Sequence, residues 1–149
     1  MLKTSLVLLF VVTTLAACTA SDTQMERYAE KFVSPPITVQ AKQLFREYAR
    51  DPEQADLQYA GHRLIISGTV HEIRDDEDFE PVIEFDVCEP DSFCFEGLVA
   101  QFSERRRQVV TAWQRGQEVT LLCYIPVDEG LGGFSVDSVV ALRMCQPYN

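Results

Sequence analysis

Five cysteines are the residues of this 149-residue chain best able to form covalent or metal bonds. Four of them, Cys88, Cys94, Cys123 and Cys145, lie in the body of the chain. The N-terminus, described below, marks the chain for export, and an even number of cysteines in an exported chain favours disulfides. A zinc site is the alternative, since four thiolates suit zinc, but the chain has no Cys-x-x-Cys spacing. We therefore predict two disulfides, no metal site and no cofactor.

The spacing of the cysteines indicates how they pair. Cys88 and Cys94 flank a five-residue turn between two expected strands, so closing that loop costs little. Elimination leaves Cys123 to pair with Cys145, on strands that should be neighbours. A plain hairpin register would set these two several residues apart. The second disulfide therefore requires an irregularity near the long loop at 126–133.

The fifth cysteine, Cys18, follows an export signal. Lys3 supplies a positive start, and residues 6–15 form an uncharged, mostly apolar run that is too short to span a bilayer stably. The segment 15–18, with the sequence LAAC, resembles the lipobox of bacterial lipoproteins. The resemblance implies a diacylglyceryl group on the Cys18 thiol, cleavage before Cys18, and acylation of the new amine, typically with palmitate. The alternative is an ordinary cleaved signal followed by a chance cysteine.

The resulting organisation has three parts: a signal peptide at 1–17, a lipidated N-terminus and tether at 18–37, and a folded domain at 38–149. Each buried methylene of an acyl chain contributes about 0.8 kcal/mol, so two or more chains anchor a protein firmly. Thr19 follows the lipidated residue, and in Gram-negative lipoproteins a residue other than Asp there implies sorting to the outer membrane. We expect the protein at the inner leaflet of that membrane, facing the periplasm.

Net charge limits the possible ligands. The chain has 23 acidic and 13 basic residues and a formal charge of -10. Loss of Lys3 with the signal leaves 12 basic residues and a charge of -11. Nucleic-acid binding needs Lys and Arg to displace counterions from phosphates, and this composition is poorly suited to it.

The elements expected to position these residues are two helices, three strands, a third helix and two more strands. Thr38 is a candidate N-cap for a helix at 39–50, whose apolar residues recur at helical spacing. Asp51 and Pro52 begin the second helix, and Gly61 ends it. Alternating apolar residues predict five strands, at about 63–73 and 82–88, one ending at about 102, and two at 119–125 and 134–145. The third helix is expected at 104–114, after the third strand.

Five strands with a helix between the third and the fourth is the order of the OB-fold, a small Greek-key barrel. Gly68 lies inside the first strand, which must bend sharply to join both halves of such a barrel. The chain also resembles the tRNA_anti-like family of small bacterial OB-fold proteins, many of them predicted lipoproteins. The residues that carry this resemblance include Leu44, Tyr48, Asp51, Ala55, Asp56, Tyr59, Gly61, Gly68 and Val70, and later Gly116, Val119, Cys123, Leu142 and Cys145.

The expected binding site is the face of the first three strands together with the acidic loop at 75–80. This loop lacks the glycine and the spaced glutamate of an EF-hand, so we interpret it as a solvated hairpin rather than a calcium site. The basic run at 105–107 more plausibly forms surface ion pairs than a phosphate site. Trp113 and Tyr124 are candidate ligand-stacking residues, although the spacing of Trp113 from Val109 favours a place in the core.

No catalytic constellation is visible. The two histidines, His62 and His71, have no evident acid or nucleophile partner, and the chain has no Gly-x-Ser-x-Gly elbow. The leading hypothesis is therefore a membrane-anchored, non-enzymatic binding module for a protein, a glycan or another small envelope component. A nucleic-acid binder is the alternative, and an envelope enzyme is the third.

Overall fold

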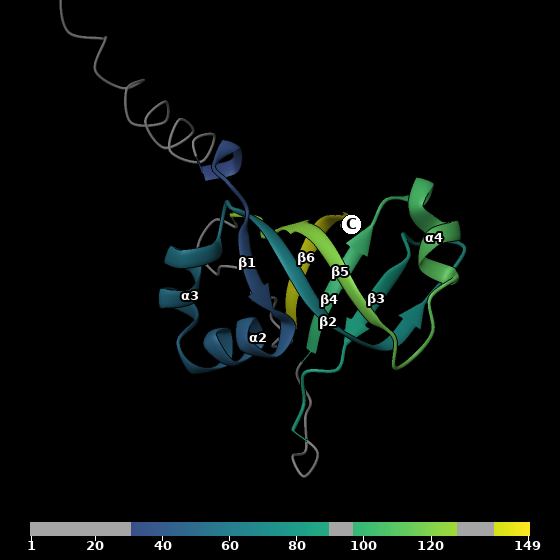
Figure 1. The fold of residues 1–149 in the computed structure, drawn as a ribbon, viewed down its shortest axis with the longest axis horizontal. Coiled ribbons are helices and arrows are strands. Elements are labelled where there is room, and N and C mark those ends of the chain that lie inside the picture. The colour runs from purple at the N-terminus through teal and green to yellow at the C-terminus, as the bar shows by residue number, and fades with distance from the viewer. Residues whose placement is uncertain (1–30, 90–96, 128–138) are drawn as a thin grey trace, which may run out of the picture.

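The structure, a computed structural model, describes residues 31–89, 97–127 and 139–149. These residues form a mainly β domain with a few short helices (Figure 1). The strands are β1 (Ile37–Gln40), β2 (Arg63–Arg74), β3 (Val82–Phe85), β4 (Gly97–Phe102), β5 (Glu118–Tyr124) and β6 (Val139–Pro147). The helices are α2 (Ala41–Arg50), α3 (Pro52–Tyr59), the 3-10 turn η1 (Glu104–Arg106) and α4 (Arg107–Thr111). Within the described residues, no helix is long and apolar enough to cross a membrane.

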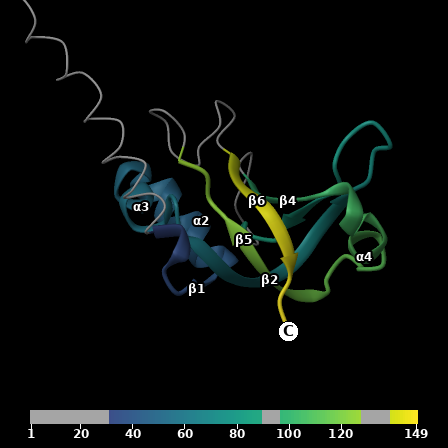
Figure 2. The ribbon, with the colours of Figure 1, turned by 90° about the horizontal axis from the view of Figure 1, so that it is seen from above.

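Five of the strands close into a barrel. The sheet order is β1-β2-β3-β4-β6-β5, and β2 also pairs with β5, which closes the ring. β4 and β6 run parallel, whereas the other barrel pairs are antiparallel. Together with the helices between β4 and β5, this topology confirms the predicted OB-fold. Figures 1 and 2 show α2 and α3 at one end of the barrel and α4 at the other.

β2 changes partners at its middle, where Gly68 lies. Thr69 is its last residue paired with β5, and Val70 is its first paired with β3. A Cβ atom on Gly68 would lie 2.7 Å from the Ala41 Cβ and 2.8 Å from the Phe85 Cδ1. Glycine is therefore required because the start of α2 and the ring of Phe85 both press on this part of the strand. The bend expected there is accompanied by a close approach that the sequence did not indicate.

The core is apolar throughout the described residues, which bury no polar or charged residue. The alternating pattern of the barrel strands is confirmed, because every second side chain points inward except where β2 and β6 are irregular. The largest fully buried side chains are those of Tyr48, Tyr59, Phe85, Phe102, Leu44, Leu64, Ile66, Ile83, Leu98, Leu121, Ile125 and Leu142.

The start of the domain differs from the prediction. Thr38 is not a helix N-cap, because residues 37–40 form β1, which pairs in parallel with residues Leu64–Ser67 of β2. The N-cap of α2 is Gln40, which makes no side-chain capping bond. β3 reaches β2 only from Val70 onward, so the preceding edge of β2 is available to β1. Backbone hydrogen bonding along that edge therefore holds residues 37–40, Thr38 among them, in a strand.

The rest of the helix pair follows the prediction. α2 buries Ala41, Leu44, Phe45 and Tyr48 along one stripe. Asp51 caps α3, and its Oδ1 accepts a hydrogen bond of 3.1 Å from the Gln54 amide. Ala60 is the C-cap of α3, and Gly61, the next residue, has a φ of 84°, the left-handed conformation that glycine adopts just beyond helix ends.

The third helix is shorter than predicted. Only Val110 is buried in α4, whereas Val109 is 41% exposed. The helix ends at Thr111 because the chain must reach β2: the Gly116 amide donates to the Val70 carbonyl and the Val70 amide to that of Gln117. β3 also stops at Phe85 rather than at residue 88. The predicted start of the last strand, residues 134–138, lies outside the described residues.

Candidate binding surfaces

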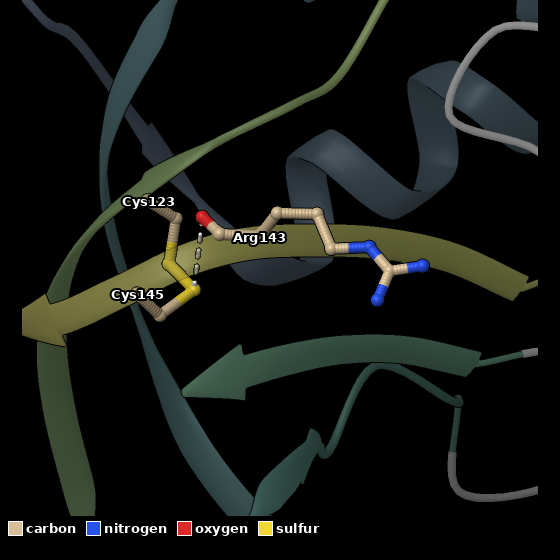
Figure 3. Close-up of a disulfide and its surroundings, with 3 residues drawn as sticks. All are labelled: Cys123, Arg143 and Cys145. Carbon is tan, nitrogen blue, oxygen red and sulfur yellow. Dashed lines mark hydrogen bonds between the residues drawn. A yellow bond between two sulfur atoms is a disulfide. The ribbon is translucent and has the colours of Figure 1, made fainter. Parts of the chain in front are cut away.

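Cys123 and Cys145 form a disulfide between β5 and β6, with their Cα atoms 4.2 Å apart (Figure 3). Leu122 pairs with Gln146 and Tyr124 with Arg143, so one residue of β5 faces two of β6. This β-bulge is the irregularity that the pairing requires. The Cys145 sulfur also lies 3.8 Å from the Arg143 carbonyl oxygen, a packing contact because a disulfide sulfur has no proton to donate.

The bulge changes the inward-facing pattern of β6. In a regular strand Met144 would continue the buried row of Val140 and Leu142, but it has a φ of 51° and is 62% exposed. Cys145 takes the inward position instead and is 3% exposed. The bulge therefore places the Cys145 sulfur, rather than the Met144 side chain, next to Cys123.

Of the other three cysteines, only Cys88 lies among the described residues. Cys88 is disulfide-bonded. Its predicted partner Cys94 lies outside the described residues, as does the lipidation candidate Cys18. Among the residues that the structure describes, no group of three or more His, Cys, Asp or Glu side chains could hold a metal ion.

The outward face of the first three barrel strands is acidic. Glu72 of β2 lies directly opposite Glu84 of β3, and like charges in that position repel. Arg74 offsets part of this charge, with its guanidinium 3.9 Å from the Glu84 carboxylate. Asp86, just beyond β3, is also exposed. The predicted binding face thus carries three carboxylates and one guanidinium among these outward residues, which suits a cationic ligand.

Arg107 fixes the acidic loop at 75–80 to α4. Its guanidinium donates hydrogen bonds to the Asp75 carboxylate and, at 2.7 Å, to the Phe79 carbonyl oxygen. It also donates to both carboxylate oxygens of Glu104, at 2.6 and 2.7 Å. The Arg107 side chain is only 20% exposed. This arginine has a structural role as a clip between the loop and the helix, which the sequence did not distinguish from its neighbours.

The other two arginines of the run at 105–107 do not extend a basic patch. Arg106 donates to the Gln146 side chain at 3.2 Å, and Arg105 is exposed. The loop at 75–80, which Arg107 holds, exposes an apolar side chain to solvent, since Phe79 is 70% exposed. The prediction of surface ion pairs is confirmed for Arg107 with Asp75 and Glu104.

The side chains of the two candidate stacking residues, Trp113 and Tyr124, each pack against another aromatic ring of the protein. Trp113 packs edge-on against Phe102, with centroids 5.6 Å apart, at the margin of the core. Tyr124 is contacted edge-on by Phe32, with centroids 5.4 Å apart. Tyr124 lies on β5, so neither ring belongs to the acidic face of β2, β3 and β4.

The two histidines lie near opposite ends of β2. Burial, and then the nearby charge of Lys31, lower the pKa of His62, whose buried Nδ1 has no hydrogen-bond partner in the described structure. His71 lines an open depression of about 370 Å³ with Glu72, Ile73 and Arg115. The structure brings neither histidine into contact with a described nucleophile.

Several residues that carry the family resemblance lock α2 to α3. Tyr48 donates a hydrogen bond of 3.0 Å to Asp56, and Tyr59 donates one of 2.6 Å to Glu47. Burial and these carboxylates raise the pKa of both phenols, and the Tyr59 hydrogen bond lowers the pKa of Glu47. We call these four residues the tyrosine clasp. The clasp stabilises the fold and offers no free reactive group.

Comparison with known proteins supports this fold and defines the family. The crystal structure of a "putative nucleic acid-binding lipoprotein" from Klebsiella pneumoniae subsp. pneumoniae MGH 78578 is similar, with a TM-score of 0.55 and 14% sequence identity. The similarity covers 76% of this chain and 92% of that one, and at this identity it concerns the fold. No curated protein matches the sequence. The tRNA_anti-like family model matches residues 1–146, and the chain is therefore a member of the tRNA_anti-like family.

Proposed function

We propose that this protein is a lipid-anchored, non-catalytic binding module of the cell envelope, whose acidic barrel face binds a basic segment of another envelope protein. The observation that carries the proposal is the opposed pair of carboxylates, Glu72 and Glu84, on the outward face of β2 and β3. A Lys or Arg side chain entering between them would relieve their repulsion. The exposed ring of Phe79 adds apolar area beside that face.

The same observation opposes nucleic-acid binding. A polyanion approaching β2 and β3 would meet Glu72, Glu84 and Asp86, and Arg74 is already close to Glu84. OB-folds that bind single strands combine a positive groove with exposed aromatic rings. The similar Klebsiella protein carries a nucleic-acid-binding name, but it shares 14% of its residues with this chain.

The location of the proposed module follows from its N-terminus. Cys18 after the apolar run would carry the acyl chains, and Thr19 favours the outer membrane, with the barrel in the periplasm. Globomycin treatment, or the change Cys18→Ala, should leave an unprocessed and unlipidated precursor. Normal membrane anchoring of the Cys18→Ala variant would refute the lipid anchor.

The binding proposal can be tested with a photo-crosslinking amino acid at Gln101, on β4 beside this face. We expect a crosslinked envelope protein with the wild-type background and at least about tenfold less of it after Glu72→Lys with Glu84→Lys, since each charge pair lost costs on the order of 1 kcal/mol or more. The matched control reverses two exposed carboxylates outside the binding face and the loop at 75–80, with Asp51 kept as a helix cap: Glu53→Lys on α3 and Glu118→Lys on β5. Equal crosslinking in both variants would overturn the assignment of this face.

A separate measurement addresses the nucleic-acid alternative. Labelled single-stranded DNA and RNA oligonucleotides should show no change in anisotropy with the purified protein at physiological salt. Saturable binding that weakens as salt rises would favour the alternative.

A further inference from the structure

A second surface, distant from the acidic face, crosses the start of β2, the end of β5 and the middle of β6. Arg63 pairs with Tyr124, and Tyr124 pairs with Arg143. Residues directly opposite one another on neighbouring strands project from the same side of a sheet. The three side chains therefore form an outward row with a cation at each end and an aromatic ring between them.

The chain entering the domain packs on this row. The Phe32 ring contacts Tyr124, and the Arg63 guanidinium carbon lies 5.8 Å from the centroid of Phe32. Arg63 donates to the Ser34 carbonyl oxygen at 3.3 Å, and the Lys31 ammonium to the Ala60 carbonyl oxygen at 3.4 Å. We call Lys31, Phe32, Arg63, Tyr124 and Arg143 the tether ledge.

The tether ledge is basic in an acidic protein. Its three cations stand against a formal charge of -10 for the whole chain. The acidic loop at 75–80 follows the other end of β2, held by Arg107 next to α4. Figures 1 and 2 show residues 31–33 on the side of α3, opposite α4. The basic row and the acidic loop therefore lie at opposite ends of β2, with the basic row where the N-terminal chain enters.

Exposed apolar side chains accompany these cations. Phe32 is 40% exposed and Val33 is 74% exposed. Leu57, one helical turn before the Ala60 carbonyl that Lys31 contacts, is 72% exposed. Lys and Arg beside aromatic and aliphatic residues are the composition found where proteins lie in a membrane interface.

We propose that the tether ledge rests on the anionic phospholipid headgroups of the membrane in which the acyl chains are embedded. This inference rests on the proposed lipidation of Cys18. Residues 19–30 span at most about 40 Å when fully extended, which keeps the ledge within reach of the bilayer. The bilayer is the occupant because the ledge adjoins the chain leading to the anchor and because its charge is complementary to phosphate. Docking in this way directs Glu72, Glu84 and the loop at 75–80 away from the membrane.

The test uses the full lipoprotein, purified from membranes and reconstituted into two kinds of vesicle. One contains phosphatidylethanolamine with phosphatidylglycerol, the other phosphatidylcholine alone, and both carry a dansyl-labelled lipid. The chain has a single tryptophan, Trp113, which lies beyond α4, away from the ledge. Energy transfer from Trp113 to the dansyl group therefore reports how close the far end of the barrel comes to the membrane.

We expect lower transfer on the phosphatidylglycerol vesicles than on phosphatidylcholine, rising toward the phosphatidylcholine value in high salt. Arg63→Glu with Arg143→Glu should lower the ratio of docked to undocked protein at least roughly thirtyfold, because each basic residue near an anionic surface contributes about 1 kcal/mol. Arg143→Glu alone is the second variant, since Arg143 is exposed and its side chain makes no contact that would endanger folding among the described residues. Arg105→Glu with Arg115→Glu changes the charge equally and should leave transfer low.

Flotation of the protein with the vesicles separates the two proposals. Protein that floats, but whose transfer is the same on both lipids and in all variants, overturns the ledge and leaves the anchor intact. Protein that floats with neither vesicle overturns the anchor and the ledge with it. Saturable oligonucleotide binding that Arg143→Glu abolishes would assign the ledge to a nucleic acid and overturn the membrane assignment.

Discussion

Tyr48 of α2 donates a hydrogen bond to Asp56 of α3, and the two residues belong to the pattern by which the sequence resembles its family. Tyr59 of α3 donates a hydrogen bond in the other direction, to Glu47 of α2, so each helix both donates and accepts one. The tyrosine rings lie with their centroids 6.4 Å apart. The family pattern at these positions therefore specifies how two helices are joined.

The hydrogen bonds of the tyrosine clasp predict that removal of either tyrosine hydroxyl lowers the stability of the protein. Tyr48→Phe and Tyr59→Phe should each reduce the free energy of unfolding by about 1.5 to 3 kcal/mol, the range for hydrogen bonds to charged groups. Urea denaturation followed by circular dichroism measures this. Leu57→Ala, at an exposed position of the same helix, should change stability by less than about 0.5 kcal/mol. Phe variants as stable as wild type would show that the clasp contributes nothing.

Gly68→Ala should destabilise the barrel, because the new methyl group would overlap Ala41 and Phe85. Overpacking of this kind costs typically about 1 to 3 kcal/mol. Removal of the Ala41 methyl in the double variant Gly68→Ala with Ala41→Gly should recover part of the loss, which a double-mutant cycle by urea denaturation would reveal. Gly97→Ala is the control, since the nearest described atoms to its Cβ would be those of the flexible Glu84 side chain, the closest at 3.2 Å. Strict additivity in the cycle would contradict the clash.

The contacts of Arg107 predict that this residue keeps the loop at 75–80 ordered. Arg107→Ala should release the loop at 75–80 from α4, so the backbone amide of Phe79 should exchange hydrogen faster in mass spectrometry. Arg107→Lys should behave like the alanine variant, because an ammonium cannot reproduce the guanidinium's bonds to Asp75, Glu104 and Phe79 together. Arg105→Ala should leave exchange unchanged. Full protection in Arg107→Lys would show that charge alone holds the loop.

The disulfide between β5 and β6 should contribute to global stability. It links residues separated by 22 positions. In the chain-entropy description, a loop of this size corresponds to about 3 kcal/mol. The double variant Cys123→Ala with Cys145→Ala should lose about that amount in urea denaturation, with Cys88 left intact. A wild-type midpoint that reductant does not move would contradict this expectation.

His62 predicts a pH dependence of stability. Burial and Lys31 lower its pKa below 6.5 in the folded state, so the unfolded chain binds the proton more tightly. Stability from neutral His62 is then fully present above pH 6.5 and is lost as the pH falls below that value toward the lowered pKa. His62→Gln should flatten this part of the stability profile. An identical slope in wild type and His62→Gln would assign the dependence to other groups.

The sequence predicted features that depend on local pattern. Alternation placed the barrel strands, and the Asp51-Pro52 pair located the start of α3, because caps and periodicity act within a few residues. Thr38 was misassigned for the opposite reason. Its backbone pairs with Ile65, and no local signal shows that this edge of β2 is open.

The same distinction applies to the surfaces. The run at 105–107 consists of three consecutive arginines that the sequence cannot tell apart, and only the fold brings Arg107 against the loop at 75–80. Phe32 lies in the segment expected to be a tether, far in sequence from Tyr124, so their contact and the ledge they form were not foreseen. The opposed carboxylates Glu72 and Glu84 depend on the register between β2 and β3, which a bulge shifts by one residue.

β2 pairs with β1, β3 and β5, so one backbone belongs to both halves of the barrel. Its ladders with β5 and β3 follow one another along a single continuous strand, so we expect them to be lost together. The described barrel should accordingly have no stable half-open intermediate, and its denaturation should be a single cooperative transition. A ligand or membrane contact at one end of β2 would then slow local opening along the whole strand.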